Sequence, residues 1–200
     1  MNATSTALLT IDLQNDFLHP EGAYGRAGQG ADSILALPDR IAPLKQALTK
    51  AGGTYISAQF TLVPGRDGNP LIAAHLKKLR PFLTKGDFAP ESFGHSLVDQ
   101  LAPADFTVEK VAYSAFYQTR LEYILRAMKI DTLIIGGIVT NVGVASTVRD
   151  AHLRDIHTVL LSDGCAAFND DVHNATLKSL GSVTEIMTCA EAAIKFGDSR

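Results

Sequence analysis

A carboxylate and a glycine-rich turn are the features of this sequence that could do chemistry. Asp12 follows a short apolar run, Ala7 to Ile11, and open α/β sheets place their ligand sites at this end of a buried strand. Gly136 and Gly137 interrupt a second apolar run, after which a helix is predicted to begin near Asn141. Such a helix N-terminus carries about half a positive charge and can hold an anion or an oxyanion. The same residues also fit an Asp that caps a turn and an ordinary strand-to-helix turn, so the pattern alone leaves these alternatives open.

The elements that must position these residues alternate between strand and helix. Short apolar runs predict strands at residues 7–11, 54–60, 106–109, from 133, 158–161 and 183–187. Helices are predicted at residues 31–51, 119–128, from 141, from 170 and 190–196. This alternation implies right-handed crossovers and a mainly parallel sheet. We therefore predict a single α/β domain over residues 1–200, with a three-layer α/β/α architecture around a mainly parallel, six-stranded, Rossmann-like sheet.

Proline and glycine interrupt this regular pattern at defined places. Pro38 and Pro43 lie within the 31–51 segment, so we expect a kink or a late helix start near Leu37. Residues 19–30 and 63–91 are rich in turn signals and are predicted to be irregular. The second of these segments carries four basic residues, Arg66, Lys77, Lys78 and Arg80. We interpret them as solvated surface charge, with the alternative that one of them meets an anionic substrate.

Composition limits the classes of function. A chain of 200 residues with 46% hydrophobic and 20% charged residues is typical of a soluble globular protein. A net charge of −3 provides no basic footprint for nucleic acid. Two cysteines are too few for a disulfide framework, which favours a reducing compartment. The sequence shows neither a signal-peptide pattern nor an apolar run of membrane-spanning length, so we expect a cytoplasmic protein that does not enter membranes.

Three motifs carry a family resemblance that covers nearly the whole chain. Residues 137–151 fit the pattern G-[VI]-x-T-x-x-C-V-x-x-T-x-x-D-A, with Gly143 at the place of the cysteine. Residues 12–17 fit D-x-Q-x-D-F, and residues 110–121 fit K-x-x-[YF]-S-A-F-x-x-T-x-L. The sequence thus resembles the isochorismatase-like hydrolases, a family that includes isochorismatases, nicotinamidases and other amidohydrolases. The resemblance implies the α/β fold predicted above.

The resemblance also implies roles for individual residues. Asp12 takes the place of the catalytic acid or base, and Lys110 that of the second catalytic residue. Asp16 is expected to hold its loop through bonds from its side chain to the backbone. The residues implied to contact a small-molecule substrate are Phe17, Gln59, Tyr113, Phe116, Ile138 and Val139. For Gln59 the similarity is a short one, to isochorismatases through Ser57-Ala58-Gln59.

Gly143 decides which chemistry can be carried over. Glycine has no nucleophile, so the acyl-enzyme route of the amidohydrolases is closed to this chain. The first hypothesis is enol-ether hydrolysis as in isochorismatases, in which Asp12 supplies a proton and no covalent intermediate forms. The second is an amidohydrolase of the nicotinamidase or ureide type whose cysteine has been replaced by Gly143, naturally or by mutation. The third is an inactive protein that binds a small molecule or a partner, against which the presence of both Asp12 and Lys110 argues.

Other residues that could do chemistry are interpreted as structural. Nicotinamidase-like relatives bind a metal just after the second strand, where this chain has residues 60–63, Phe-Thr-Leu-Val, so we expect neither a metal nor another cofactor. His75 and His95 are isolated and are expected at the surface or in loops. Cys165 and Cys189 are expected to be structural. The resemblance further implies a cis peptide bond between Ile138 and Val139, and assembly into a homo-oligomer.

Overall fold

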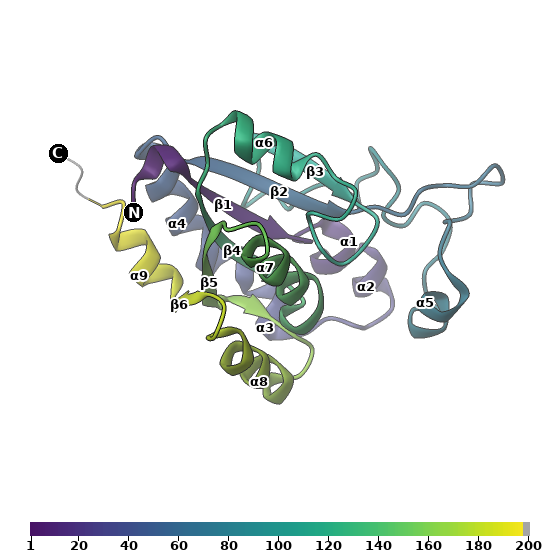
Figure 1. Ribbon diagram of the computed structural model, residues 1–200. Coiled ribbons are helices and arrows are strands. Elements are labelled where there is room, and N and C mark those ends of the chain that lie inside the picture. Colours follow the sequence, from purple (N-terminus) through teal and green to yellow (C-terminus); the bar gives the residue numbers. More distant parts are fainter. Residues whose placement is uncertain (198–200) are drawn as a thin grey trace.

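Six parallel strands form the centre of the molecule (Figure 1). In the computed structural model, which describes residues 1–197, they are ordered β3-β2-β1-β4-β5-β6. Their bounds are β1 (Thr6–Ile11), β2 (Thr54–Phe60), β3 (Phe106–Lys110), β4 (Thr132–Ile138), β5 (His157–Ala166) and β6 (Glu185–Met187). The predicted α/β fold with its six-stranded parallel sheet is confirmed. Residues 198–200 of the predicted domain lie outside the described part.

Helices cover both faces of the sheet, which is why its central strands are apolar throughout. Every residue of β1 is buried, and its side chains alternate between two cores. Leu9 packs with α6 (Leu121–Ala127), α7 (Ala145–His152) and α8 (Asp170–Leu180). Leu8 packs with α3 (Asp32–Leu35), α4 (Leu37–Lys50) and α9 (Cys189–Ile194). The result is the predicted three-layer arrangement (Figure 1).

The glycine pair of β4 allows this strand to lie close to β1. Gly137 pairs with Ile11 and has a φ of +116°, a conformation that favours glycine. A Cβ atom at Gly137 would collide with the carbonyl oxygen of Ile11. The glycine therefore brings the carboxyl end of β4 against the end of β1, where the order of the strands reverses. Such a switch point is where open α/β sheets form their ligand sites.

The structure refines several predicted boundaries. The helix expected over residues 31–51 is divided at Ala36, and α4 starts at Leu37 with Pro38 in its first turn, as anticipated. The helix expected from Asn141 begins instead as a π-helical turn, η2 (Thr140–Val144), that leads into α7. Short helical turns occur in segments for which no helix was predicted: η1 (Ala3–Ser5), α1 (Asn15–Leu18), α2 (Ala23–Arg26) and α5 (Ala74–Leu79).

The segment between β2 and β3 extends beyond the carboxyl ends of the strands and carries α5 (Figure 1). It joins residues from α2 and α1 in a small third cluster, to which Tyr24, Leu62 and Phe88 belong. This cluster closes one side of the region above Asp12. Among residues 1–197, no helix has the length and apolar character that crossing a bilayer requires.

Candidate active site

Asp12 and Lys110 meet at the carboxyl edge of the sheet. Asp12 directly follows β1 and has a φ of 59°, a left-handed conformation that is uncommon outside glycine and is held here by a 2.8 Å hydrogen bond from its N–H to the carbonyl of Ala58. Lys110 is the last residue of β3. Its Nζ donates to Asp12 Oδ2 at 2.9 Å and to the carbonyl oxygen of Ala112 at 3.1 Å. The two residues that the resemblance implies to be catalytic are therefore in direct contact.

The pair is buried, and this burial controls its charge. Asp12 and Lys110 expose only 7% and 1% of their surfaces. Burial raises the pKa of Asp12 above its usual range, and the nearby Lys110 ammonium opposes that shift. Asp12 Oδ1 has no hydrogen-bond partner within residues 1–197. A carboxyl with a raised pKa and an unengaged oxygen can exchange a proton with a bound molecule.

Gly143 lies in η2 and faces the carboxylate of Asp12. A Cβ atom built at Gly143 would lie 3.5 Å from Asp12 Oδ2 and 3.1 Å from the carbonyl oxygen of Ile138. Its φ is not positive, so the backbone itself would accept a side chain at this position. A cysteine there would require the neighbours at Ile138 and Ile11 to shift by a few tenths of an ångström, and its Cβ would lie beside the Asp12 carboxylate. The peptide bond between Ile138 and Val139 is cis, as predicted.

Thr147 joins the turn at Gly143 to the segment that follows Lys110. Its hydroxyl donates to the carbonyl oxygen of Gly143 at 2.8 Å and accepts from the N–H of Ala115 at 3.0 Å. Its surface is fully buried. Both bonds fix the position of η2 relative to the loop between Lys110 and α6.

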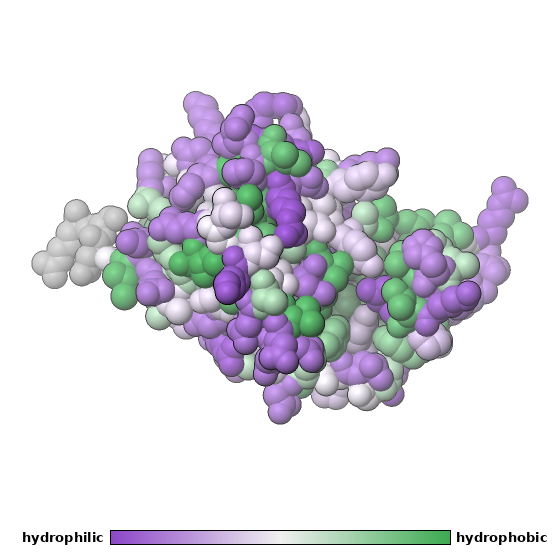
Figure 2. Space-filling view, turned by 60° about the horizontal axis from the view of Figure 1, so that its bottom comes forward, coloured by the Kyte–Doolittle hydropathy of each residue, from purple (hydrophilic) through white to green (hydrophobic). Residues whose placement is uncertain are grey.

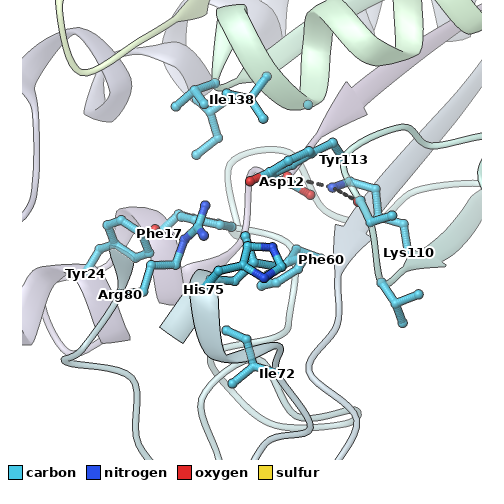
Figure 3. Close-up of a pocket in the computed structure, with 16 residues that line it drawn as sticks. Asp12, Phe17, Tyr24, Phe60, Ile72, His75, Arg80, Lys110, Tyr113 and Ile138 are labelled. Carbon is cyan, nitrogen blue, oxygen red and sulfur yellow. Dashed lines mark hydrogen bonds and ion pairs between the residues drawn. The ribbon is translucent and has the colours of Figure 1, made fainter. Parts of the chain in front are cut away.

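A cavity of about 230 Å³ opens above these residues (Figure 3). Asp12 and Lys110 border one side of it, and Arg80 and Tyr24 border another. Gly143, which faces Asp12, also lines the cavity. Its walls are mostly apolar and include Phe17, Phe60, Ile72, Val111, Ile138 and Val139. Its size and lining fit a small molecule with a polar reacting group.

Four of the six residues predicted to contact the substrate line this cavity: Phe17, Tyr113, Ile138 and Val139. Gln59 and Phe116 are not among the residues that line it, and their contact with the substrate stays a prediction. Neighbouring side chains of a strand point to opposite faces, so Gln59 of β2 points away from the side on which Phe60 borders the cavity. Phe116 packs into the core, with the guanidinium of Arg154 4.8 Å from its ring centre.

The loop motif at residues 12–17 works through bonds to the backbone. Asp16 accepts from the N–H groups of Ala23 and Phe88 at 2.9 and 2.6 Å, which is the structural role predicted for it. Gln14, to which no role was assigned, accepts from the N–H of Phe60 at 2.7 Å and donates to its carbonyl at 3.0 Å. These bonds hold Phe60 at the cavity wall. The glutamine at a fixed position of the motif could have indicated this role, since one side-chain amide can bond both the N–H and the carbonyl of a backbone residue.

The histidines and cysteines differ in their surroundings. His95 lies in a loop but is buried, and its Nε2 lies 2.8 Å from Thr61 Oγ1, whereas His75 is exposed and borders the cavity. Cys165 and Cys189 are both buried, and burial raises the pKa of each thiol. Within residues 1–197, no three His, Cys, Asp or Glu residues are grouped so as to hold a metal. The residues that follow β2 do not fit the metal site of nicotinamidase-like relatives.

Comparison with known proteins identifies the family. A family model described as an isochorismatase domain matches residues 6–192. The chain belongs to the isochorismatase family. It is accordingly a hydrolase, and all three motifs on which the resemblance rests contribute residues to its cavity.

Members of this family with a recorded activity are similar over most of the chain. The ureidoacrylate amidohydrolase RutB of Methylorubrum extorquens is 33% identical over 173 residues, which cover 81% of this chain and 70% of that protein. That of Methylobacterium radiotolerans is 32% identical over 192 residues, covering 90% and 74%. Among solved structures, a cysteine hydrolase from Pseudomonas syringae pv. phaseolicola has a TM-score of 0.83 at 28% identity, covering 98% of this chain and 94% of that one.

Proposed function

We propose that this isochorismatase-family hydrolase has a site of the amidohydrolase type for a small amide or ureide, in which Gly143 replaces the nucleophilic cysteine. The observation that carries the proposal is the similarity to ureidoacrylate amidohydrolases at 32–33% identity. The geometry supports it, because Asp12 and Lys110 lie where they would activate a thiol at position 143. This was the second hypothesis drawn from the sequence, and the similarity to amidohydrolases now favours it over enol-ether hydrolysis.

The residues present define what a thiol at this position would experience. Asp12 Oδ2, 3.5 Å from the Cβ position, would accept the thiol proton, and the ammonium of Lys110 would stabilise the charges that form. The thiolate would then attack the carbonyl carbon, and the proton held by Asp12 would pass to the departing amine. Without the thiol, this sequence of steps has no nucleophile in the protein.

The decisive experiment compares the chain with its Gly143→Cys variant on amides and ureides, by release of ammonia or amine. We expect no turnover by the chain itself and measurable turnover by Gly143→Cys. Asp12→Asn added to Gly143→Cys should lower kcat by about 10²–10⁴-fold, the contribution of a general acid or base. Absence of turnover by Gly143→Cys on every amide and ureide tested would overturn the proposal.

A second candidate is hydrolysis of an enol ether such as isochorismate, and two observations favour it. Enol-ether hydrolysis needs no protein nucleophile, so it is compatible with a glycine at position 143. The raised pKa of Asp12 suits a residue that donates a proton. Asp12 would protonate the vinyl carbon, water would add to the oxocarbenium ion, and the hemiketal would collapse to pyruvate and a dihydrodiol acid. Pyruvate release from isochorismate by the unmodified chain, lost in Asp12→Asn, would establish this function in place of the first.

The protein is also proposed to form a homo-oligomer. Apolar residues gather at the end of the molecule where the α5 segment lies (Figures 1 and 2). In this segment Leu71 and Leu79 are 66% and 70% exposed. Sedimentation equilibrium at micromolar concentration should give a mass that is a multiple of 21.4 kDa. A single species of that monomer mass would contradict this part of the proposal.

A further inference from the structure

Arg80 points into the cavity with most of its hydrogen-bonding capacity unused. It follows α5 and is partly buried, and Figure 3 shows its guanidinium directed toward the space that Asp12 borders. Its Nε donates to the hydroxyl of Tyr24 at 3.0 Å, which is the one hydrogen bond of its side chain within residues 1–197. None of the ion pairs among those residues includes Arg80. Tyr113, which also lines the cavity, lies close enough to interact with the guanidinium, and the N–H groups that neither tyrosine engages have no protein acceptor within residues 1–197.

Tyr24 holds this guanidinium in a defined orientation. The ring of Tyr24 packs on Phe17 at 4.8 Å between centroids and stacks with Phe168 at 5.8 Å. A rigid phenol that engages Nε leaves the outer edge of the guanidinium for another partner. That edge has two parallel N–H donors that match the two oxygens of a carboxylate.

The other cations near the cavity do not offer the same site. Lys110 is already paired with Asp12. Lys77 and Lys78 of α5 and Arg66 before it are exposed and do not line the cavity. A partly buried positive charge beside apolar walls is poorly solvated, so an anion bound there offsets the cost of its burial. Of the four basic residues considered as anion partners from the sequence, Arg80 alone has this setting.

We propose that Arg80 anchors a carboxylate of the substrate on the side of the cavity opposite Asp12. This inference rests on the proposed function, because it adds an acid group to a molecule whose amide or ureide lies at Asp12 and Gly143. The substrate class is then a short carboxylic acid that carries an amide or ureide at its other end. The apolar walls at Phe17, Phe60 and Ile138 contact the carbon chain between these groups.

Binding can be measured without turnover. The probes are 3-ureidopropanoate and its neutral analogue 3-ureidopropanamide, titrated by calorimetry into the unmodified chain, Arg80→Met, Arg80→Lys and Lys78→Met. We expect the unmodified chain to bind the carboxylate roughly 10- to 100-fold more tightly than the amide, the range for hydrogen bonds to charged groups. Arg80→Met should abolish this preference. Lys78→Met removes the same charge from the exposed side of α5 and should keep it.

Arg80→Lys separates the shape of the guanidinium from its charge. A lysine keeps the positive charge but cannot form two parallel bonds, so the preference should fall at least threefold while the amide binds as before. Thermal unfolding verifies that each variant folds. If Arg80→Met does not fold, the carboxylate preference of Arg80→Lys tests the inference. Equal affinities of the unmodified chain for both probes, no binding of 3-ureidopropanoate at millimolar concentration, or an unchanged preference in the folded Arg80 variants would overturn the inference.

The outcome is independent of the proposed reaction. If the carboxylate preference depends on Arg80 but Gly143→Cys hydrolyses no amide or ureide, the carboxylate site stands and the proposed function fails. If Gly143→Cys hydrolyses carboxylate and neutral ureides with the same kcat/KM, the function stands and the role of Arg80 fails.

Discussion

The Lys110 ammonium lies 2.9 Å from Asp12 Oδ2, while Oδ1 of the same carboxylate has no hydrogen-bond partner among the described residues. One oxygen is thus engaged by a buried cation and the other remains available to a bound molecule. Removing either member would leave the opposite charge in a poorly solvated position. The pair is therefore linked both to stability and to proton transfer, and the two can be tested separately.

Lys110→Met should destabilise the protein more at high pH than at low pH. Burial already raises the pKa of Asp12, and loss of the ammonium that opposes this shift raises it further. Between the unfolded and folded pKa values the native state binds more protons, so the free energy of unfolding falls as pH rises. We expect a loss of about 3–5 kcal/mol at pH 8 and a smaller loss at pH 5, measured by urea unfolding.

The double variant Asp12→Asn/Lys110→Met is the matched control for this measurement. It carries neither charge, so its stability relative to the unmodified chain should lack the additional pH dependence of Lys110→Met. An equal loss for Lys110→Met at pH 5 and pH 8 would show that Asp12 does not carry an uncompensated charge in the variant.

The pH dependence of activity should distinguish the two candidate reactions. Amide hydrolysis by Gly143→Cys requires Asp12 as a base, so its rate should fall as pH drops through the raised pKa of this carboxyl. Enol-ether hydrolysis requires Asp12 as an acid, so its rate should fall as pH rises through the same pKa. The measurement is kcat/KM across pH for whichever substrate is turned over. A kcat/KM that changes with pH in the opposite direction would exclude the role assigned to Asp12 in that reaction.

Thiol labelling should report the environment at position 143 directly. Burial raises the pKa of Cys165 and Cys189, so neither should react with iodoacetamide at pH 7.5 while the protein is folded. Gly143→Cys should take up one label, located at residue 143 by mass spectrometry, and more slowly when Lys110→Met is added. Labelling of Cys165 or Cys189 at a similar rate would contradict the buried positions of these thiols.

The sequence predicted the parts of the site that lie at strand ends. Asp12, Lys110 and Gly143 follow or end elements with clear apolar patterns, and the carboxyl ends of parallel strands meet at one edge. Arg80 could not be separated from Arg66, Lys77 and Lys78, because all four lie in a turn-rich segment with no period to orient them.

Long-range contacts determine where that irregular segment lies. The Asp87 carboxylate forms an ion pair with the distant Arg26 at 2.6 Å and accepts a hydrogen bond from the N–H of the neighbouring Thr84 at 2.7 Å. Tyr24 lies in α2, within residues 19–30, a segment predicted from the sequence to be irregular. His95 lies in a loop, one of its two predicted settings, and its burial beside Thr61 is a long-range contact that the local sequence does not describe. Local sequence describes the strands, and tertiary packing brings the remaining residues to the cavity.

Thr147→Val tests whether the turn at Gly143 must be held in place. The substitution keeps the shape of the side chain but removes the acceptor for the N–H of Ala115 and the donor to the carbonyl of Gly143. Both backbone groups would be left without this partner in a buried position, which costs about 1–3 kcal/mol each. We expect a loss of stability of about 2–6 kcal/mol and, in the Gly143→Cys background, a lower kcat with a smaller change in KM.

Thr176→Val provides the control for that measurement. Thr176 makes the same type of hydrogen bond, to the carbonyl oxygen of Val172 at 2.7 Å, but in the more exposed helix α8 and without a second backbone partner. Water can replace this bond, so the substitution should change the free energy of unfolding by less than about 1 kcal/mol and leave kcat unchanged. If Thr147→Val and Thr176→Val have the same effect on kcat, the bonds of Thr147 do not position Gly143 for the reaction, and the turn is held by the π-helical backbone alone.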